Sequence, residues 1–365
     1  MGISDGLTIG LFSTIAVSLT LFAVLAWRKI YRPTFTNFLI RLLIIVLCQA
    51  LVVITVGLEV NRQNGFYESW NDLFGTTSSY SQSSTTAGAM ATITQSQLTH
   101  ANKTSLDSLL VREVISGKQS HVSNVVYLDL PAAAVADINK RIPLDPKRYR
   151  VVEFLTGFPS QPLMWVKTLG IDKVLATYNQ NHVGHEVIGI IPQVNIAGHY
   201  DLECMNLPGT RPRAETWLSS DIHSYLSTRL GMRDSKWGIM GVSTGAWCAA
   251  MLSIRHPELY SAAASIAGYY RPALPAANPI ALQNEMSAKY DLSKAEASLT
   301  MTQNLYITAS LGDRYSMSET KRFLSIKHPH VAVTYRELKS GGHHSQVWVK
   351  LIPDALVWLE RNISV

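Results

Sequence analysis

The sequence predicts an α/β fold, a mostly parallel sheet with helices on both faces, preceded by an N-terminal hairpin of two transmembrane helices. Two long apolar runs lie within the first 60 of its 365 residues. A hydroxyl-rich stretch follows, and from residue 109 short apolar runs alternate with helical patterns, as in α/β sheets. We therefore expect three parts: two helices joined by a short basic loop in residues 1–60, a flexible Ser/Thr-rich linker in residues 61–108, and one α/β domain in residues 109–365.

The two apolar runs cover residues 7–27 and 39–60. Each is close to the roughly 20 residues that cross a bilayer as a helix. Neither run shows the polar face of a surface helix, so a membrane span is favoured over a buried hairpin. A cleavable signal peptide is the alternative for the first run. Against it, no positive segment precedes the run and no small-residue cleavage site follows it.

The formal net charge of +6 has an uneven distribution. Arg28, Lys29 and Arg32 lie between the two apolar runs. The positive-inside rule places that loop in the cytoplasm, so both chain ends and everything after Val60 are expected outside it. This predicts a multi-pass protein of the cell membrane with its folded domain extracytoplasmic. No long basic tract interleaved with aromatic residues occurs, which argues against a nucleic-acid partner.

The linker is predicted from composition. Residues 76–86 are almost entirely Ser, Thr and Gln, with too little apolar surface to support a core. A stretch of this kind is typical of a flexible spacer, which here would hold the α/β domain off the membrane.

The α/β domain is expected to begin with a strand hairpin and to end with an amphipathic helix. Strands are expected over residues 110–115, 124–130, 149–155, 186–192, 237–240, 261–267, 304–310 and 331–338. Helical spacing covers residues 214–230, 244–256 and 347–361.

The most informative motif lies between the strand at 237–240 and the helix that follows. Gly241-Val242-Ser243-Thr244-Gly245 fits G-x-S-x-G, a sharp strand-to-helix turn that exposes a serine hydroxyl above the sheet. The flanking glycines are expected because the turn leaves no room for side chains. The pentapeptide alone is a weak signal, but the strand before it and the alanine-rich helix after it match the required context.

A serine hydroxyl needs a base, and the base needs an acid to orient it. In this kind of fold the partners follow in the order serine, acid, histidine. Asp313 and His343 come directly after the two next predicted strands, so Ser243, Asp313 and His343 should meet at one edge of the sheet. Glu319 is an alternative acid, and periodicity cannot separate His343 from its neighbour His344.

Two backbone N–H groups should hold the oxyanion that forms during attack. One is expected from Thr244, directly after the serine, and the other from Phe158, in the turn after the strand at 149–155. An ordinary turn is the alternative for Phe158. His182 and His185 have a spacing found in metal sites, but no further ligand lies nearby, so we predict neither a metal nor a cofactor.

The chain has three cysteines. Cys48 falls in the second apolar run, whereas Cys204 and Cys248 lie in the α/β domain. An extracytoplasmic pair could be oxidised, and a buried free thiol at Cys248 is equally compatible with the sequence. Whether these two cysteines pair stays open.

Several segments in order resemble the esterase D and mycolyltransferase branch of α/β hydrolases. They cover residues 126–131, 152–158, 214–222 and 342–348. The last segment is similar to the family pattern G-x-H-x-W-x-x-W, in which the catalytic histidine precedes the final tryptophan by five positions. That spacing to Trp348 selects His343 over His344, although Ser345 replaces the first tryptophan of the pattern.

The resemblance implies acyl transfer through an acyl-serine intermediate, with cell-envelope lipid esters such as trehalose mycolates as donors. The partners would be that donor, a sugar or water acceptor, the membrane and an envelope membrane protein. We therefore expect an extracytoplasmic, membrane-tethered serine acyltransferase or esterase. The alternatives are a simple carboxylesterase or lipid hydrolase, a peptidase, or a non-catalytic envelope-complex subunit that retains the fold.

Overall fold

The computed structural model describes residues 2–3, 5–27, 34–64, 70, 108–198, 200–295 and 302–364. The chain divides into two compact units, Met1–Tyr80 and Ser81–Val365. The basic loop around Arg28 and the hydroxyl-rich part of the predicted linker lie outside the described residues.

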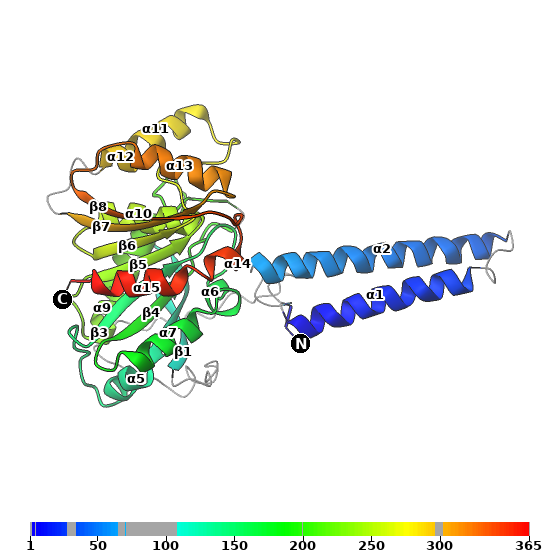
Figure 1. The fold of residues 1–365 in the computed structure, drawn as a ribbon, viewed down its shortest axis with the longest axis horizontal. Coiled ribbons are helices and arrows are strands. Elements are labelled where there is room, and N and C mark those ends of the chain that lie inside the picture. Colours follow the sequence, from blue (N-terminus) through cyan, green and yellow to red (C-terminus); the bar gives the residue numbers. More distant parts are fainter. Residues whose placement is uncertain are drawn as a thin grey trace. The chain divides into compact units, whose positions relative to one another are not determined.

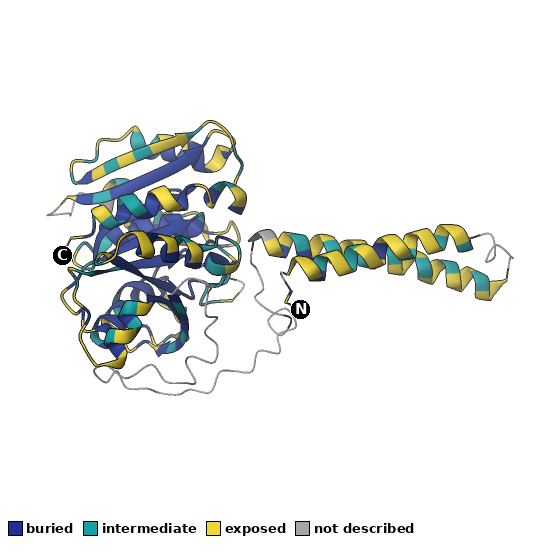
Figure 2. Cartoon of the chain, turned by 60° about the horizontal axis from the view of Figure 1, so that its bottom comes forward, coloured by how far each residue is buried: buried dark blue, intermediate teal, exposed yellow. Residues whose placement is uncertain are grey.

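The first unit contains two long apolar helices, α1 (Gly6–Ala26) and α2 (Phe35–Asn64), which lie side by side and antiparallel (Figure 1). Their mean hydropathy is 2.2 for Gly6–Ala26 and 2.7 for Phe35–Arg62, and both are long and apolar enough to cross a membrane. Most of their residues are exposed or intermediate (Figure 2), and many large apolar residues are among the exposed ones, unlike in a core helix of a soluble domain. Helix α2 continues four residues beyond the predicted apolar run.

The second unit is built on an eight-stranded sheet of order β1-β2-β4-β3-β5-β6-β7-β8. Its strands are β1 (Ser108–Ser116), β2 (Ser123–Pro131), β3 (Tyr149–Leu155), β4 (Glu186–Pro192), β5 (Trp237–Val242), β6 (Tyr260–Ile266), β7 (Gln303–Ser310) and β8 (Val331–Leu338). Strand β2 is antiparallel to both β1 and β4, and every later pairing is parallel. The predicted leading hairpin and mostly parallel sheet are confirmed.

Helices cover both faces of this sheet (Figure 1). One face carries α5 (Ala132–Asn139), α8 (Ala214–Thr216), η1 (Trp217–Ile222), α9 (His223–Leu230), α10 (Thr244–Arg255), α11 (Ile280–Tyr290), α12 (Leu292–Ala295) and α13 (Arg314–Leu324). The other carries α6 (Met164–Lys167), α7 (Ile171–Asn181), α14 (Ser345–Trp348) and α15 (Ile352–Arg361).

The burial of the strands explains why the sequence showed them as apolar runs. Successive residues of a strand point to opposite faces, so Val151 of β3 packs in one core and Val152 in the other. Strands β4, β5 and β6 are buried along their whole length, as expected when helices cover both faces. Strand β8 lies at the edge, and many of its residues are exposed.

Two predicted helices differ in detail from the structure. The single helix predicted over residues 347–361 is wrong, because α14 ends at Trp348 and α15 starts at Ile352. Pro353 stands in the first turn of α15, where its missing N–H and its ring are tolerated, whereas further inside a helix they would break it. The helix predicted over residues 214–230 is continuous but contains the π-helical stretch η1, which no simple periodicity reports.

Candidate active site

Ser243 stands between β5 and α10 at a strained point of the backbone. Its φ of 57° and ψ of −124° lie where residues with side chains are rare. A Cβ on Gly241 would lie 1.9 Å from the Gly245 carbonyl oxygen, and a Cβ on Gly245 would lie 2.2 Å from that of Leu155. Both glycines are therefore required by the close approach of two backbone segments, as the motif predicts.

Ser243, His343 and Asp313 are joined by two hydrogen bonds. Ser243 Oγ lies 2.8 Å from His343 Nε2, and His343 Nδ1 lies 2.5 Å from Asp313 Oδ2. A neutral imidazole that donates from Nδ1 to the carboxylate leaves Nε2 free to accept from the serine hydroxyl. The arrangement can remove a proton from the serine as its oxygen attacks a carbonyl carbon.

Because the strands are parallel, the residues that follow them lie together at the carboxyl ends of the strands. Ser243 follows β5, Asp313 follows β7, and His343 follows β8. Asp313 is buried and is the N-cap of α13, where its carboxylate accepts a hydrogen bond from the Ser316 N–H (3.2 Å) through Oδ1. The other oxygen is thereby aimed at His343. The imidazole is 40% exposed and has Trp348 edge-on against it, at 5.1 Å between ring centroids.

The structure separates the alternatives that the residues alone left open. Glu319 forms ion pairs with Arg271 (2.8 Å) and Arg322 (3.3 Å), so its carboxylate is engaged on α13. His344 is the N-cap residue of α14. Asp313 and His343 are the pair that meets Ser243, in agreement with the spacing to Trp348.

The turn after β3 lies directly against the serine. A Cβ on Gly157 would lie 3.0 Å from Ser243 Cβ and 3.5 Å from its Oγ. Phe158 is the next residue of this turn. Within the described part of the chain, the N–H groups of Phe158 and Thr244 have no hydrogen-bond partner. Both N–H groups are therefore available to a ligand.

Asn195 supports this turn and was not foreseen from the sequence. Its side-chain amide donates to the carbonyl oxygens of Ser160 (2.6 Å) and Gly157 (3.4 Å). Asn195 comes shortly after β4, at the same edge of the sheet as Ser243. A polar residue at a strand exit is the signal that could have found it.

Cys204 and Cys248 form a disulfide. Cys248 lies on α10, five residues after Ser243, and Cys204 lies in the connection between β4 and α8. The bond therefore ties that connection to the helix that follows the serine, which answers the question that the sequence left open. Cys48 is a free cysteine on α2.

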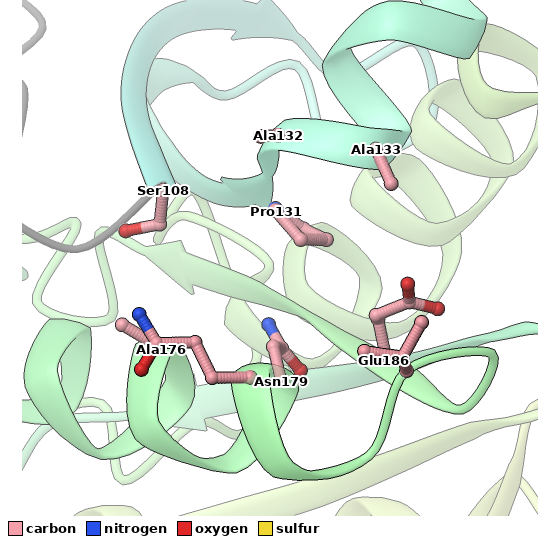
Figure 3. A pocket seen from close by; sticks show the side chains of 9 residues that line it. Ser108, Pro131, Ala132, Ala133, Ala176, Asn179 and Glu186 are labelled. Carbon is pink, nitrogen blue, oxygen red and sulfur yellow. The ribbon is translucent and has the colours of Figure 1, made fainter.

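Among the described residues, cavities also lie away from Ser243, and two of them are larger than 100 Å³. One of about 180 Å³ lies between α5 and α7, with Ser108, Pro131 and Glu186 in its lining (Figure 3). Glu186 begins β4, so this cavity lies at the amino end of that strand, whereas Ser243 lies at the carboxyl ends of the strands. The other, about 410 Å³, lies between α7 and α15. Neither lining contains a nucleophile paired with a base, so the Ser243 site is the candidate active site.

His182 and His185 do not come together with other ligands. Across the described ranges, no group of three or more His, Cys, Asp or Glu side chains could hold a metal ion. The His182 ring stacks on Tyr178, and its Nδ1 lies 2.8 Å from the Tyr178 carbonyl oxygen.

Comparison with known proteins identifies the family to which the chain belongs. The family model Esterase, described as "Putative esterase", matches residues 144–359, which is more than half of the chain. No curated protein matches the chain in sequence.

Solved structures share the fold at low identity. A ferulic acid esterase matches with a TM-score of 0.58 and 16% identity, covering 71% of this chain and 100% of that chain. An S-formylglutathione hydrolase from Agrobacterium tumefaciens matches with a TM-score of 0.58 and 12% identity, covering 72% of this chain and 98% of that chain. MPT51 of Mycobacterium tuberculosis matches with a TM-score of 0.51 and 13% identity, covering 70% of this chain and 99% of that chain. The chain has the α/β-hydrolase fold of these structures, and by its sequence it belongs to the Esterase family.

Proposed function

We propose that this chain is a membrane-tethered serine acyltransferase or esterase whose catalytic domain lies outside the cytoplasm. The observation that carries the proposal is the pair of hydrogen bonds from Ser243 through His343 to Asp313, at 2.8 and 2.5 Å. A binding module has no need of a nucleophile, base and acid in this arrangement. Membership of the Esterase family supports ester chemistry at this site.

In the acylation step, His343 Nε2 takes the proton of Ser243 as the serine oxygen attacks the ester carbonyl carbon. The negative charge moves to the carbonyl oxygen, which accepts hydrogen bonds from the N–H groups of Phe158 and Thr244. The protonated imidazole then gives its proton to the departing alcohol oxygen. The products are an acyl-serine and a free alcohol. Asp313 holds the tautomer of His343 and stabilises its positive charge.

The acyl group leaves by the same chemistry in reverse. His343 removes a proton from an incoming hydroxyl group, whose oxygen attacks the acyl-serine carbonyl carbon. A sugar hydroxyl yields a new ester, and water yields a free acid. In both cases the proton returns to Ser243 and the enzyme is regenerated.

For the substrate we propose lipid esters of the cell envelope, such as trehalose mycolates. The resemblance of residues 126–131, 152–158, 214–222 and 342–348 to mycolyltransferases supports this class. The exposed apolar surfaces of α1 and α2 support anchoring of the chain in a membrane by these two helices. We propose an envelope membrane protein as a further partner. Hydrolysis of a carboxylic ester is the second function at the same site, and the family supports it.

Two observations support the extracytoplasmic location. The basic residues between the apolar runs favour a cytoplasmic loop. The Cys204–Cys248 disulfide fits an oxidising compartment.

Labelling with a fluorophosphonate tests the nucleophile. We expect one adduct on Ser243 in the folded full-length chain and none in Ser243→Ala. A folded wild-type chain without an adduct would sink the proposal.

Incubation of the full-length chain in detergent with a trehalose monoester separates the two reactions. Trehalose diester as the main product supports transfer, and free acid supports hydrolysis. The absence of both products, while a simple aryl ester is turned over, would overturn the proposed substrate class.

A further inference from the structure

The connection between β4 and α8 is held in an unusual backbone conformation beside α10, the helix that follows the nucleophile. Glu203 and Cys204 both have positive φ values, 49° and 57°, which residues with side chains seldom adopt. Such a conformation persists only when surrounding contacts hold it in place. Two of these contacts come from α10: the Cys204–Cys248 disulfide and the Trp247 indole N–H, which donates to the Glu203 carbonyl oxygen (3.0 Å).

The Glu203 side chain adds a third connection and is 3% exposed. The Tyr269 hydroxyl donates to its Oε1 (2.9 Å), and the Ala273 N–H donates to its Oε2 (2.7 Å). Both partners belong to the segment after β6. One carboxyl group therefore joins two connections that flank the beginning of α10.

Tyr269 extends this network to the first turn of α10. Its ring stacks on Trp247, with 5.8 Å between ring centroids and 9° between planes. Trp247 stands in that first turn, and its backbone N–H donates to the Ser243 carbonyl oxygen (3.2 Å). A chain of contacts thus runs from Glu203 through Tyr269 and Trp247 to Ser243.

We propose that Glu203 is a positioning residue for the reaction at Ser243, acting through Tyr269 and Trp247 on the first turn of α10. The inference rests on the proposed function, in which the Thr244 N–H holds the oxyanion. An oxyanion donor contributes most when its direction is set before the reaction begins. Holding Trp247 restrains the first turn of α10, and with it the direction of the Thr244 N–H.

The charge state of Glu203 should make kcat depend on pH, whereas a residue that only packs in the core would not have this effect. Burial, with the neighbouring Asp201 adding to it, raises the pKa of Glu203 to about 8, so at neutral pH the carboxyl group is uncharged. The other titratable and charged groups facing this cluster are Tyr269 and Arg271 after β6, and Tyr315 and Glu319 on α13. An ionised carboxylate in this buried network beside α10 would oppose the developing oxyanion, because buried like charges repel strongly.

Three variants of the full-length chain in detergent test this chain of contacts, with p-nitrophenyl butyrate as substrate. We expect Glu203→Met and Tyr269→Phe each to lower kcat about fivefold to tenfold, the effect of about one hydrogen bond, with KM within about twofold of wild type. Glu203→Gln keeps a neutral polar group and should retain most of kcat. If Glu203→Met fails to fold, the conservative Tyr269→Phe still tests the inference.

The chain offers a matched control in Glu153 and Tyr260. The Tyr260 hydroxyl donates to Glu153 Oε2 (2.7 Å), Glu153 is fully buried, and burial raises its pKa to about 8 as well. Glu153 lies within β3 and Tyr260 begins β6, so the pair is away from the carboxyl ends of the strands. Glu153→Gln and Tyr260→Phe should change the melting temperature and leave kcat unchanged.

The pH profile completes the test. In the wild-type chain we expect kcat to fall as the pH rises through about 8, and this alkaline limb should be absent in Glu203→Gln but present in Glu153→Gln. Wild-type kcat in Tyr269→Phe, or an unchanged alkaline limb in Glu203→Gln, would overturn the inference. Fluorophosphonate labelling of Ser243 keeps the two proposals apart: with an adduct and unaffected variants only the inference fails, whereas without an adduct both fail.

Discussion

The replacement of Asp313 by asparagine separates the two roles of this side chain. Its Oδ1 caps α13 by accepting from the Ser316 N–H, and its Oδ2 accepts from His343 Nδ1. Asparagine caps helices about as well as aspartate, so the amide oxygen should stay on the cap. The amide N–H₂ would then face His343 Nδ1, where two donors would meet, and the imidazole would move its proton to Nε2.

The consequence for catalysis follows from the other ring nitrogen. Nε2 lies 2.8 Å from Ser243 Oγ, and a protonated Nε2 has no lone pair to accept the serine proton. In a triad of this geometry the wrong tautomer lowers kcat about 10⁴-fold. That factor corresponds to about 5 kcal/mol of activation free energy. Because the cap is retained, the free energy of unfolding should change by less than about 1 kcal/mol.

The assay is kcat for p-nitrophenyl butyrate together with the melting temperature of the full-length chain. Glu319→Gln is the matched control: it removes a carboxylate from the same helix and breaks ion pairs to Arg271 and Arg322, and kcat should stay near the wild-type value. Asp313→Asn with kcat within tenfold of wild type and a lower melting temperature would refute the reasoning. It would mean that the amide oxygen had turned to His343 and given up the cap.

Three further predictions concern single residues. Gly245→Ala should lower the melting temperature or prevent folding, because its Cβ would lie 2.2 Å from the Leu155 carbonyl oxygen; a wild-type melting curve would contradict the close approach. Asn195→Ala should lower kcat about threefold to tenfold, with little change in KM, by releasing the turn at residues 157–160; unchanged kcat would show that the turn keeps its conformation without these hydrogen bonds. Burial lowers the pKa of His223 to about 4, so its contribution to stability is full above the unfolded value near 6.5 and is lost as the pH falls toward 4. The loss is about 3 kcal/mol, and urea unfolding of His223→Gln should depend less on pH in that window than unfolding of the wild-type chain.

Local patterns in the sequence were sufficient to predict most of the fold. Buried parallel strands appear as short apolar runs because helices cover both faces, and this located every strand of the α/β domain. The two long apolar helices follow from composition and length alone. The turn around Ser243 could also be predicted from nearby residues. A side chain on Gly241 would clash with the backbone of Gly245, and a side chain on Gly245 would clash with the backbone of Leu155 at the end of β3.

The tertiary structure decided what depends on residues far apart in the chain. His343 meets Ser243 across 100 positions and Asp313 across 30, so no local period distinguishes Asp313 from Glu319. The disulfide, with 44 positions between its cysteines, depends on the same long-range packing. The chain of contacts from Glu203 through Tyr269 to Trp247 has no sequence signal, because these residues become buried and meet only when the connections after β4 and β6 fold against the start of α10. The sequence by itself determined which chemical groups stand at the strand ends, and the packing of the sheet determined which of them touch.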